Sequence, residues 1–125
     1  MPYVPVRGDI IVIALDPPKN KEFAGRHHTI CLSADNDSSR VALFCPLTSF
    51  KPAKPNPPDD YAVLIPADFT GKPCWALPRH IKSLDWAARG AKKRMGRLNH
   101  AFTDIILASL RDWTQMEASP YGKKR

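Results

Sequence analysis

Short apolar segments separated by turn-forming residues fill most of this chain and limit it to a fold built mainly from β-strands. The clearest segment, residues 10–15, is rich in β-branched side chains and lies between Gly8-Asp9 and Asp16-Pro17-Pro18, which predicts a buried strand. Residues 29–33 and 41–45 are also apolar and are joined by polar turn residues. They predict an antiparallel pair of strands.

The segment 51–58 contains four prolines and is too proline-rich to form ladder hydrogen bonds, so it predicts an exposed, extended loop. Beyond this loop, residues 61–65, 74–77 and 80–84 have the composition and length of short strands. A polar loop is expected at residues 19–25.

The C-terminal part of the chain follows a helical period instead. Its apolar residues at that spacing are Phe102, Ile105, Ile106, Leu110 and Trp113. Asn99 is placed to cap the N-terminus and Pro120 marks a stop. We expect an amphipathic helix of roughly four to five turns that packs on the sheet. The predicted fold class is therefore mainly β with a C-terminal helix, arranged as a small, partly open SH3-like barrel.

Composition indicates one small domain and an anionic partner. A chain of 125 residues suits a single core. A formal net charge of +7 attracts a polyanion or an acidic protein that imitates one, although a soluble basic protein can carry such a charge without binding nucleic acid. Cys31, Cys45 and Cys74 are widely spaced and predict reduced thiols in a cytoplasmic protein. The minor alternative is a metal site that combines them with His27, His28 or His80, although the usual ligand spacing is absent. No secretory signal or membrane span is expected, because the longest apolar run is short.

Positive charge is concentrated between residues 78 and 97. The basic residues of this segment are Arg79, Lys82, Arg89, Lys92, Lys93, Arg94 and Arg97, and the one acidic residue is Asp85. Such clusters bind phosphates by releasing condensed counterions, with Trp86 as a possible stacking surface. The alternative is a solvated connecting turn, with Trp75 and Trp86 as core residues.

Four short motifs occur in a fixed order along the chain: Arg7-Gly8-Asp9-Ile10-Ile11, Glu22-x-Ala24-Gly25-Arg26, Cys45-Pro46-x-Thr48-Ser49 and Ile81-Lys82-Ser83-Leu84-Asp85-Trp86. In this order the chain resembles the MazF/PemK family of bacterial toxin endoribonucleases, from about residue 6 to about residue 110. The resemblance implies a MazF/CcdB-type barrel, which we place at residues 1–118 and follow with a basic tail at 119–125. It also implies a homodimer with no metal and no cofactor.

Metal-free cleavage of RNA requires a base for the ribose 2′-hydroxyl, an acid for the leaving 5′-oxygen, and fixed donors to the phosphate. Histidine, arginine and hydroxyl side chains can supply all three. The candidates here are Lys21, Glu22, Arg26, His27, His28, Thr48, Ser49 and His80.

The resemblance carries the family's catalytic residues onto two places in this chain. The family loop after the first strand reads Glu-Gln-x-Gly-x-Arg-Pro, and its arginine is catalytic. In the matching segment 22–28, His27 stands at the arginine position and Arg26 is displaced by one residue. Because a one-residue shift turns a strand side chain to the opposite face, Arg26 replaces that arginine only if the loop bends or bulges. The family's threonine matches Thr48, so the predicted catalytic residues are Arg26, His27 and Thr48.

The RNA-binding residues that we predict are Lys21, Glu22, Ser49, Arg79, His80 and Lys82. Family members usually carry Asp-Gln where this chain has Arg79-His80. The change removes base-reading groups and adds positive charge, so the RNA sequence preference of the family need not apply.

These departures leave several functions open. In the preferred interpretation, His27 and His80 form an acid–base pair, since histidine changes charge near neutral pH, and Arg26 and Thr48 hold the phosphate of single-stranded RNA. An acidic, initially disordered antitoxin would fold into the basic groove, and toxin and antitoxin together would bind DNA. The first alternative is a catalytically impaired barrel that binds nucleic acid or protein, and the last is a gyrase poison of the CcdB type.

Overall fold

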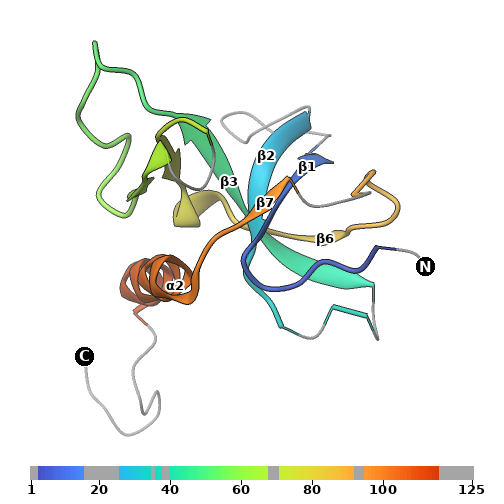
Figure 1. The fold of residues 1–125 in the computed structure, drawn as a ribbon. Coiled ribbons are helices and arrows are strands. Elements are labelled where there is room, and N and C mark those ends of the chain that lie inside the picture. The colour runs from blue at the N-terminus through green and yellow to red at the C-terminus, as the bar shows by residue number, and fades with distance from the viewer. Residues whose placement is uncertain are drawn as a thin grey trace, which may run out of the picture.

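The computed structural model describes residues 3–15, 26–34, 36–37, 40–67, 71–91 and 95–115. The elements follow in the order β1 (Asp9–Ala14), β2 (Arg26–Cys31), β3 (Val41–Ser49), β4 (Val63–Ile65), β5 (Cys74–Ala76), the short 3₁₀ helix η1 (Pro78–His80), β6 (Lys82–Asp85), β7 (Gly96–Arg97) and α2 (His100–Thr114). Strands thus precede one C-terminal helix, and the predicted fold class is confirmed (Figure 1). Three predicted features lie outside the described residues: the loop at 19–25, the stop at Pro120 and the basic tail at 119–125.

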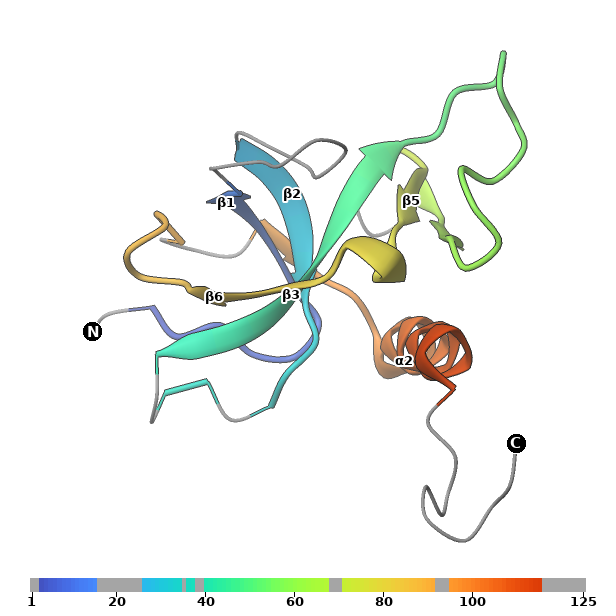
Figure 2. The same cartoon turned by 180° about the vertical axis from the view of Figure 1, so that it is seen from behind.

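The strands form one antiparallel sheet in the order β4-β5-β3-β2-β1-β7, and β6 also pairs with β3. Strand β3 connects the two parts of this sheet. Its first residues pair with β6, where Phe44 lies opposite Lys82, and its last residues pair with β5, where Thr48 lies opposite Trp75. The view from behind shows β3 running through the middle of the curled sheet (Figure 2).

Several strand boundaries differ from the prediction. Strand β2 begins at Arg26 rather than at residue 29, because β1 pairs with the polar residues His27 and His28 through their backbones. Strand β3 continues past Cys45 to Ser49, and its carbonyl at Pro46 accepts a hydrogen bond from the Leu77 amide. The segment predicted as a strand at 80–84 begins later, since the proline of η1 favours a helical turn.

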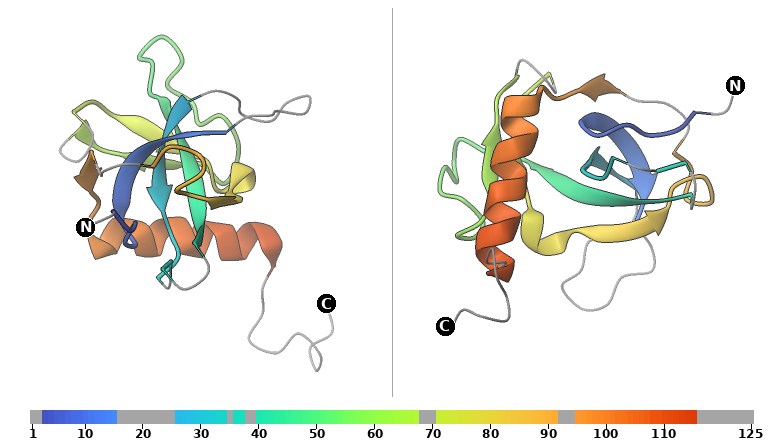
Figure 3. Two further views of the ribbon diagram at one scale, coloured as in Figure 1. Left: turned by 90° about the vertical axis from the view of Figure 1, so that its right-hand side faces the viewer. Right: turned by 90° about the horizontal axis from the view of Figure 1, so that it is seen from below.

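Two apolar cores lie on opposite faces of the sheet. Helix α2 covers the first core across one end of the strands (Figure 3). Its buried members are Ile10, Ile30, Leu32, Cys45, Leu47, Ile65, Cys74, Ala76, Leu98 and Ile106. The second core contains Ile11, Ile13, Leu15, Cys31, Ala42, Phe44, Leu84, Trp86 and Ala91. Both cores exist because residues alternate between the faces of β1, β2 and β3.

Helix α2 has the predicted cap. The Asn99 side chain accepts a hydrogen bond from the Phe102 amide at 3.3 Å. The helix ends where Gln115 adopts a left-handed conformation, with φ of 55°. Ile106 is fully buried, whereas Ile105 and Trp113 are 48% and 36% exposed. The apolar stripe that faces the sheet is therefore narrower than the sequence predicts.

A buried carboxylate lies where the chain enters β1. Asp9 is fully buried and accepts hydrogen bonds from the Tyr3 hydroxyl at 2.5 Å, the Val6 amide at 3.0 Å and the Arg97 Nε at 2.8 Å. Burial, followed by the hydrogen bond to Asp9, raises the pKa of Tyr3. We call Tyr3, Asp9 and Arg97 the charged corner.

The turn before this corner requires glycine. Gly8 has a φ of +95°, and a Cβ atom there would lie 2.8 Å from the Leu98 carbonyl oxygen. The Gly-Asp pair of the first motif thus shapes the turn before β1 and supplies the carboxylate that Arg97 neutralises. Among the described residues, no helix is long and apolar enough to cross a membrane.

Candidate functional site

The C-terminal end of β3 carries two hydroxyl side chains from the third motif. Thr48 is half-buried and Ser49 is exposed, and they lie opposite Trp75 and Cys74 of β5. Consecutive residues of a strand point to opposite faces. The end of β3 therefore presents one hydroxyl to each side, and a hollow lies on each side.

The larger hollow, which we call the groove, has a volume of about 490 Å³. It is lined by Thr48, Ser49, Lys51, Lys54, Asn56, Pro58, Trp75, Leu77 and His80. Three predicted site residues, Thr48, Ser49 and His80, meet here although η1 is distant from β3 in the sequence. Two ammonium groups, one imidazole and the Thr48 hydroxyl around one space can bind and neutralise a phosphate.

The proline-rich loop forms one wall of the groove. Residues 51–58 are all exposed, as the sequence predicts, and a tight turn is closed by a 2.8 Å hydrogen bond from the Lys54 amide to the Lys51 carbonyl. Sequence reasoning assigned no function to this loop. The sequence did carry one signal for a binding role, which is the presence of two lysines among prolines. Proline limits the backbone freedom of the lysines beside it and so helps to fix their positions.

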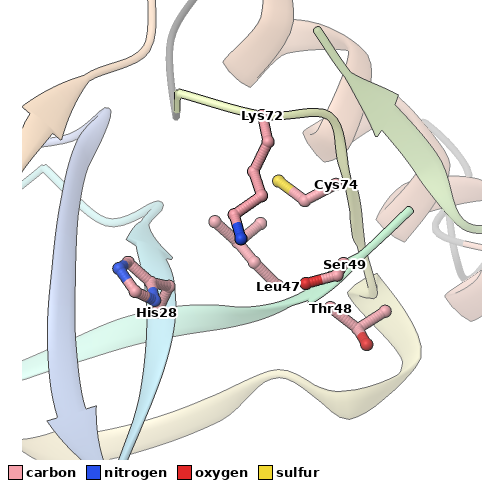
Figure 4. A pocket seen from close by; sticks show the side chains of 6 residues that line it. All are labelled: His28, Leu47, Thr48, Ser49, Lys72 and Cys74. Carbon is pink, nitrogen blue, oxygen red and sulfur yellow. The ribbon is translucent and has the colours of Figure 1, made fainter. Parts of the chain in front are cut away.

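The smaller hollow has a volume of about 180 Å³ and is lined by His28, Leu47, Thr48, Ser49, Lys72 and Cys74. Figure 4 shows the ammonium end of Lys72 reaching into the space between His28 and the end of β3, with Thr48 turned to the other side of the strand. His28 was only a general candidate in the sequence and Lys72 was missed. No motif assigns a role to either residue. The pairing of β2 with β3 brings His28 to this strand end, and the pairing of β3 with β5 brings Lys72 there.

Strand pairing shows how the two neighbouring histidines are oriented. Thr29 lies opposite Pro46, and because side chains alternate, His27 shares the face of Thr29 while Thr48 shares the face of Pro46. His27 and Thr48 therefore lie on one face of the β2–β3 pair, and His28 lies on the other. His27 is half-buried and His28 is exposed.

Three of the predicted residues fall wholly or partly outside the described structure. Arg26 opens β2 and its backbone pairs with Ala14, but its side chain lies outside the described part. Lys21 and Glu22 lie outside it altogether. Which of Arg26 and His27 takes the role of the family's catalytic arginine therefore stays a prediction.

The basic segment 78–97 is divided among several internal contacts. The Arg79 guanidinium lies 6.0 Å from the centre of the Trp113 ring. Arg97 bonds Asp9 in the charged corner, and Arg89 Nη1 lies 3.5 Å from the Ala14 carbonyl oxygen.

The other basic residues of the segment do not join them in one surface. Residues 92–94 lie outside the described residues. Lys82 is half-exposed in β6, opposite Phe44. The described part of the segment is therefore not one continuous phosphate-binding surface.

Trp86, which the sequence offered as a stacking surface, differs in position from Trp75. Trp86 is 5% exposed in the second core, where its Nε1 donates to the Asn36 carbonyl at 3.0 Å and Arg40 lies 5.9 Å from its ring centre. It is a core residue rather than a stacking surface. Trp75 is 8% exposed and borders the groove.

The three cysteines are buried and form no disulfide. Burial raises the pKa of Cys45 to about 12 and also raises the pKa of Cys31. The thiols of Cys45 and Cys31 therefore stay protonated and unreactive at neutral pH. Within the described ranges, no three His, Cys, Asp or Glu side chains come together in a way that could hold a metal ion.

Comparison with known proteins defines the class of the chain. Residues 6–114 match the family described as the PemK-like, MazF-like toxin of type II toxin-antitoxin systems. The chain belongs to this family, which confirms the resemblance seen in the four motifs.

Individual relatives agree with that assignment. The endoribonuclease toxin MazF of Escherichia coli strain K12 is 34% identical over 94 residues, which cover 74% of this chain and 78% of the relative. The crystal structure of MazF from Deinococcus radiodurans is similar with a TM-score of 0.78 and 26% identity, covering 91% of this chain and 99% of that one. A MazE–MazF crystal structure from the same organism has a TM-score of 0.71 and 25% identity, covering 92% and 100%.

Proposed function

We propose that this protein is the toxin of a type II toxin–antitoxin pair and that it cleaves single-stranded RNA, mRNA in particular, as a metal-independent, homodimeric endoribonuclease. The observation that carries the proposal is the groove, where Thr48, Ser49 and His80 meet Lys51 and Lys54 at the end of β3. Membership of the MazF-like family supports the same activity, since its Escherichia coli relative is named an endoribonuclease.

In the proposed reaction, the ribose 2′-oxygen attacks the neighbouring phosphorus and the bond from phosphorus to the 5′-oxygen breaks. A base takes the 2′-hydroxyl proton and an acid donates a proton to the leaving 5′-oxygen. The products are a 2′,3′-cyclic phosphate and a 5′-hydroxyl. No outside oxidant or water molecule is consumed in this step.

Residues of the groove and of β2 are proposed for these tasks. His80 and His27 are the proposed acid–base pair, because histidine accepts and releases protons near neutral pH. Thr48, which shares a sheet face with His27, is proposed to donate a hydrogen bond to a phosphoryl oxygen, and Arg26 to neutralise the phosphate. Fixed donors of this kind stabilise the charge that grows in the transition state.

The basic groove also suggests how the protein is restrained. The lysines that attract RNA would attract acidic side chains equally well. A MazE–MazF complex is known for a relative of similar fold. We therefore propose an acidic antitoxin that covers the groove in the cytoplasm and binds DNA together with this protein.

Cleavage in EDTA of a long single-stranded RNA tests the proposal. Wild-type protein should produce fragments with cyclic-phosphate ends, and Thr48→Ala should lose this activity while keeping its fold. Thr114→Ala is the matched control, because Thr114 is exposed at the end of α2, and it should cleave like wild type. Intact RNA from a folded dimer between pH 5 and 8, with RNA binding retained, would contradict catalysis and favour the binding module.

A further inference from the structure

We infer that the smaller hollow is a second RNA subsite, which binds the phosphodiester next to the one that is cleaved. Lys72 would supply the main charge, with His28 and the Ser49 hydroxyl as further donors. This inference rests on the proposed ribonuclease function and concerns how the substrate crosses the site.

The first support is the position of the hollow. Thr48 and Ser49 line both the groove and the smaller hollow, so the two spaces meet at the end of β3. An RNA strand that enters the groove and passes Thr48 can continue past Ser49 toward Lys72 and His28, which line the smaller hollow.

The second support is the size and chemistry of the hollow. Its volume of about 180 Å³ is below the range of roughly 300–1,000 Å³ that is usual for pockets holding small organic ligands. It is therefore better suited to one phosphate group than to a whole nucleoside. Leu47 and Cys74 are 5% and 7% exposed and form an apolar lining, which strengthens the attraction between an ammonium group and a phosphate.

The third support is the position of the Lys72 side chain. Lys72 is exposed, and its ammonium end points into a hollow that also contains an imidazole and a hydroxyl. A cation beside further hydrogen-bond donors suits an anionic ligand.

Binding of short RNAs of increasing length tests the subsite. The probes are a dinucleotide, a trinucleotide and a tetranucleotide taken from a mapped cleavage site, with a 2′-O-methyl group on the ribose that would attack. Wild-type affinity, followed by fluorescence anisotropy, should rise about tenfold when the second phosphodiester is added on one side. Lys72→Gln should lose this rise and leave dinucleotide binding unchanged. It should also lower the slope of log affinity against log salt concentration by the amount expected for about one phosphate contact.

Two further variants make the test specific. Arg111→Gln removes the same charge from an exposed position on α2 and should bind every probe like wild type. His28→Gln should reduce the second rise in affinity only in part. In kinetics on a long RNA, Lys72→Gln should raise KM about tenfold with little change in kcat.

The possible failures can be told apart. If wild type cleaves RNA and Lys72→Gln matches it on every probe, the subsite is wrong and the ribonuclease stands. If Lys72→Gln weakens binding of a glutamate-rich peptide but of no RNA probe, the hollow receives an acidic protein and the inference is overturned. If wild type neither cleaves nor binds RNA, the proposed function itself fails.

Discussion

The charged corner and the end of β3 both contain cationic and hydroxyl side chains but use them in opposite ways. In the corner, Asp9 is fully buried and Arg97 neutralises it at 2.8 Å, so charge is matched inside the fold. At the end of β3, Lys51, Lys54 and Lys72 are exposed and border open hollows. The corner stabilises the protein, and the strand end can bind an outside anion.

This difference teaches how a basic sequence segment should be interpreted. Charge clustered along the chain between residues 78 and 97 suggested one binding surface, but the fold gives Arg97 and Arg79 internal partners. The lysines that border the hollows, Lys51, Lys54 and Lys72, all lie outside that segment. Among the described residues, every buried side-chain nitrogen or oxygen atom has a hydrogen-bond partner, so the polar interior is satisfied without any ligand.

The largest expected effect lies in the corner. Asp9→Ala should lower the free energy of unfolding by about 3 kcal/mol, because the Tyr3 hydroxyl and the Val6 amide lose their acceptor and Arg97 loses its counter-charge. Urea unfolding followed by circular dichroism measures the change. Asp104→Asn, at an exposed position on α2, should change stability by no more than about 0.5 kcal/mol. Equal stability of Asp9→Ala and wild type would contradict the structural role of the corner.

At the strand end, the expected effect falls on activity instead. Thr48→Ala should reduce kcat about a hundredfold, which corresponds to about 2.7 kcal/mol, because one fixed donor to the phosphate is removed. Its unfolding free energy should stay within about 1 kcal/mol of wild type, since Thr48 is only half-buried. If Thr48→Ala instead lost much stability and cleaved RNA normally, the end of β3 would have a structural role like that of the corner.

The lysines of the groove should contribute to substrate binding more than to chemistry. Lys51→Gln combined with Lys54→Gln should raise KM for a long RNA about tenfold, with a weaker salt dependence, because two phosphate contacts are lost. Initial rates at 50 and 200 mM salt measure this. The tenfold change equals about 1.4 kcal/mol. If kcat falls and KM stays constant, these lysines act in the chemical step.

Alkaline pH should weaken the corner specifically. The pKa of Tyr3 is raised above its ordinary value of 10.0, so above pH 10 the unfolded chain releases a phenolic proton that the folded chain retains. This contribution to stability is complete below pH 10 and is lost as pH rises, by up to about 1.4 kcal/mol for each pH unit. Tyr3→Phe should show a shallower decline between pH 10 and 11. If the stability of Tyr3→Phe and of wild type falls equally with pH, the Tyr3 hydroxyl does not hold its proton on Asp9 as the structure indicates.

The smallest effect distinguishes two roles for Arg79. As a contact of α2, its stacking on Trp113 should contribute about 0.5 kcal/mol to stability, and Arg79→Ala and Trp113→Ala should lower the melting temperature similarly. As the predicted RNA-binding residue, Arg79 should instead affect KM while stability stays constant. Comparing both readouts in both variants decides whether Arg79 belongs with the corner or with the groove.

Much of the fold was predictable because its signals are local. Asn99 and the helical spacing after it predict α2, and β-branched residues bounded by turn formers predict β1. The limits of β2 and β7 were not predictable. His27 and His28 extend β2 only because β1 supplies partners for their backbones, and the two residues of β7 carry too little pattern to indicate a strand.

The candidate site divides in the same way. Its residues Thr48, Ser49 and His80 were predicted, and they meet in the groove. The sequence did not predict the roles of Lys51, Lys54 and Lys72 or the placement of His28. Each depends on contacts between segments distant in the sequence. A lysine has the same local signature whether it faces bulk water or a hollow.

The sequence by itself determined the order of the elements, the family motifs and the excess of positive charge, because each depends on residue types and spacings along the chain. The tertiary structure alone decided which charges are matched internally and which border a hollow. Long-range strand pairing makes that decision, since the pairing of β3 with β5 gathers the hydroxyls and cations at one strand end while the pairing of β1 with β7 brings Arg97 to Asp9.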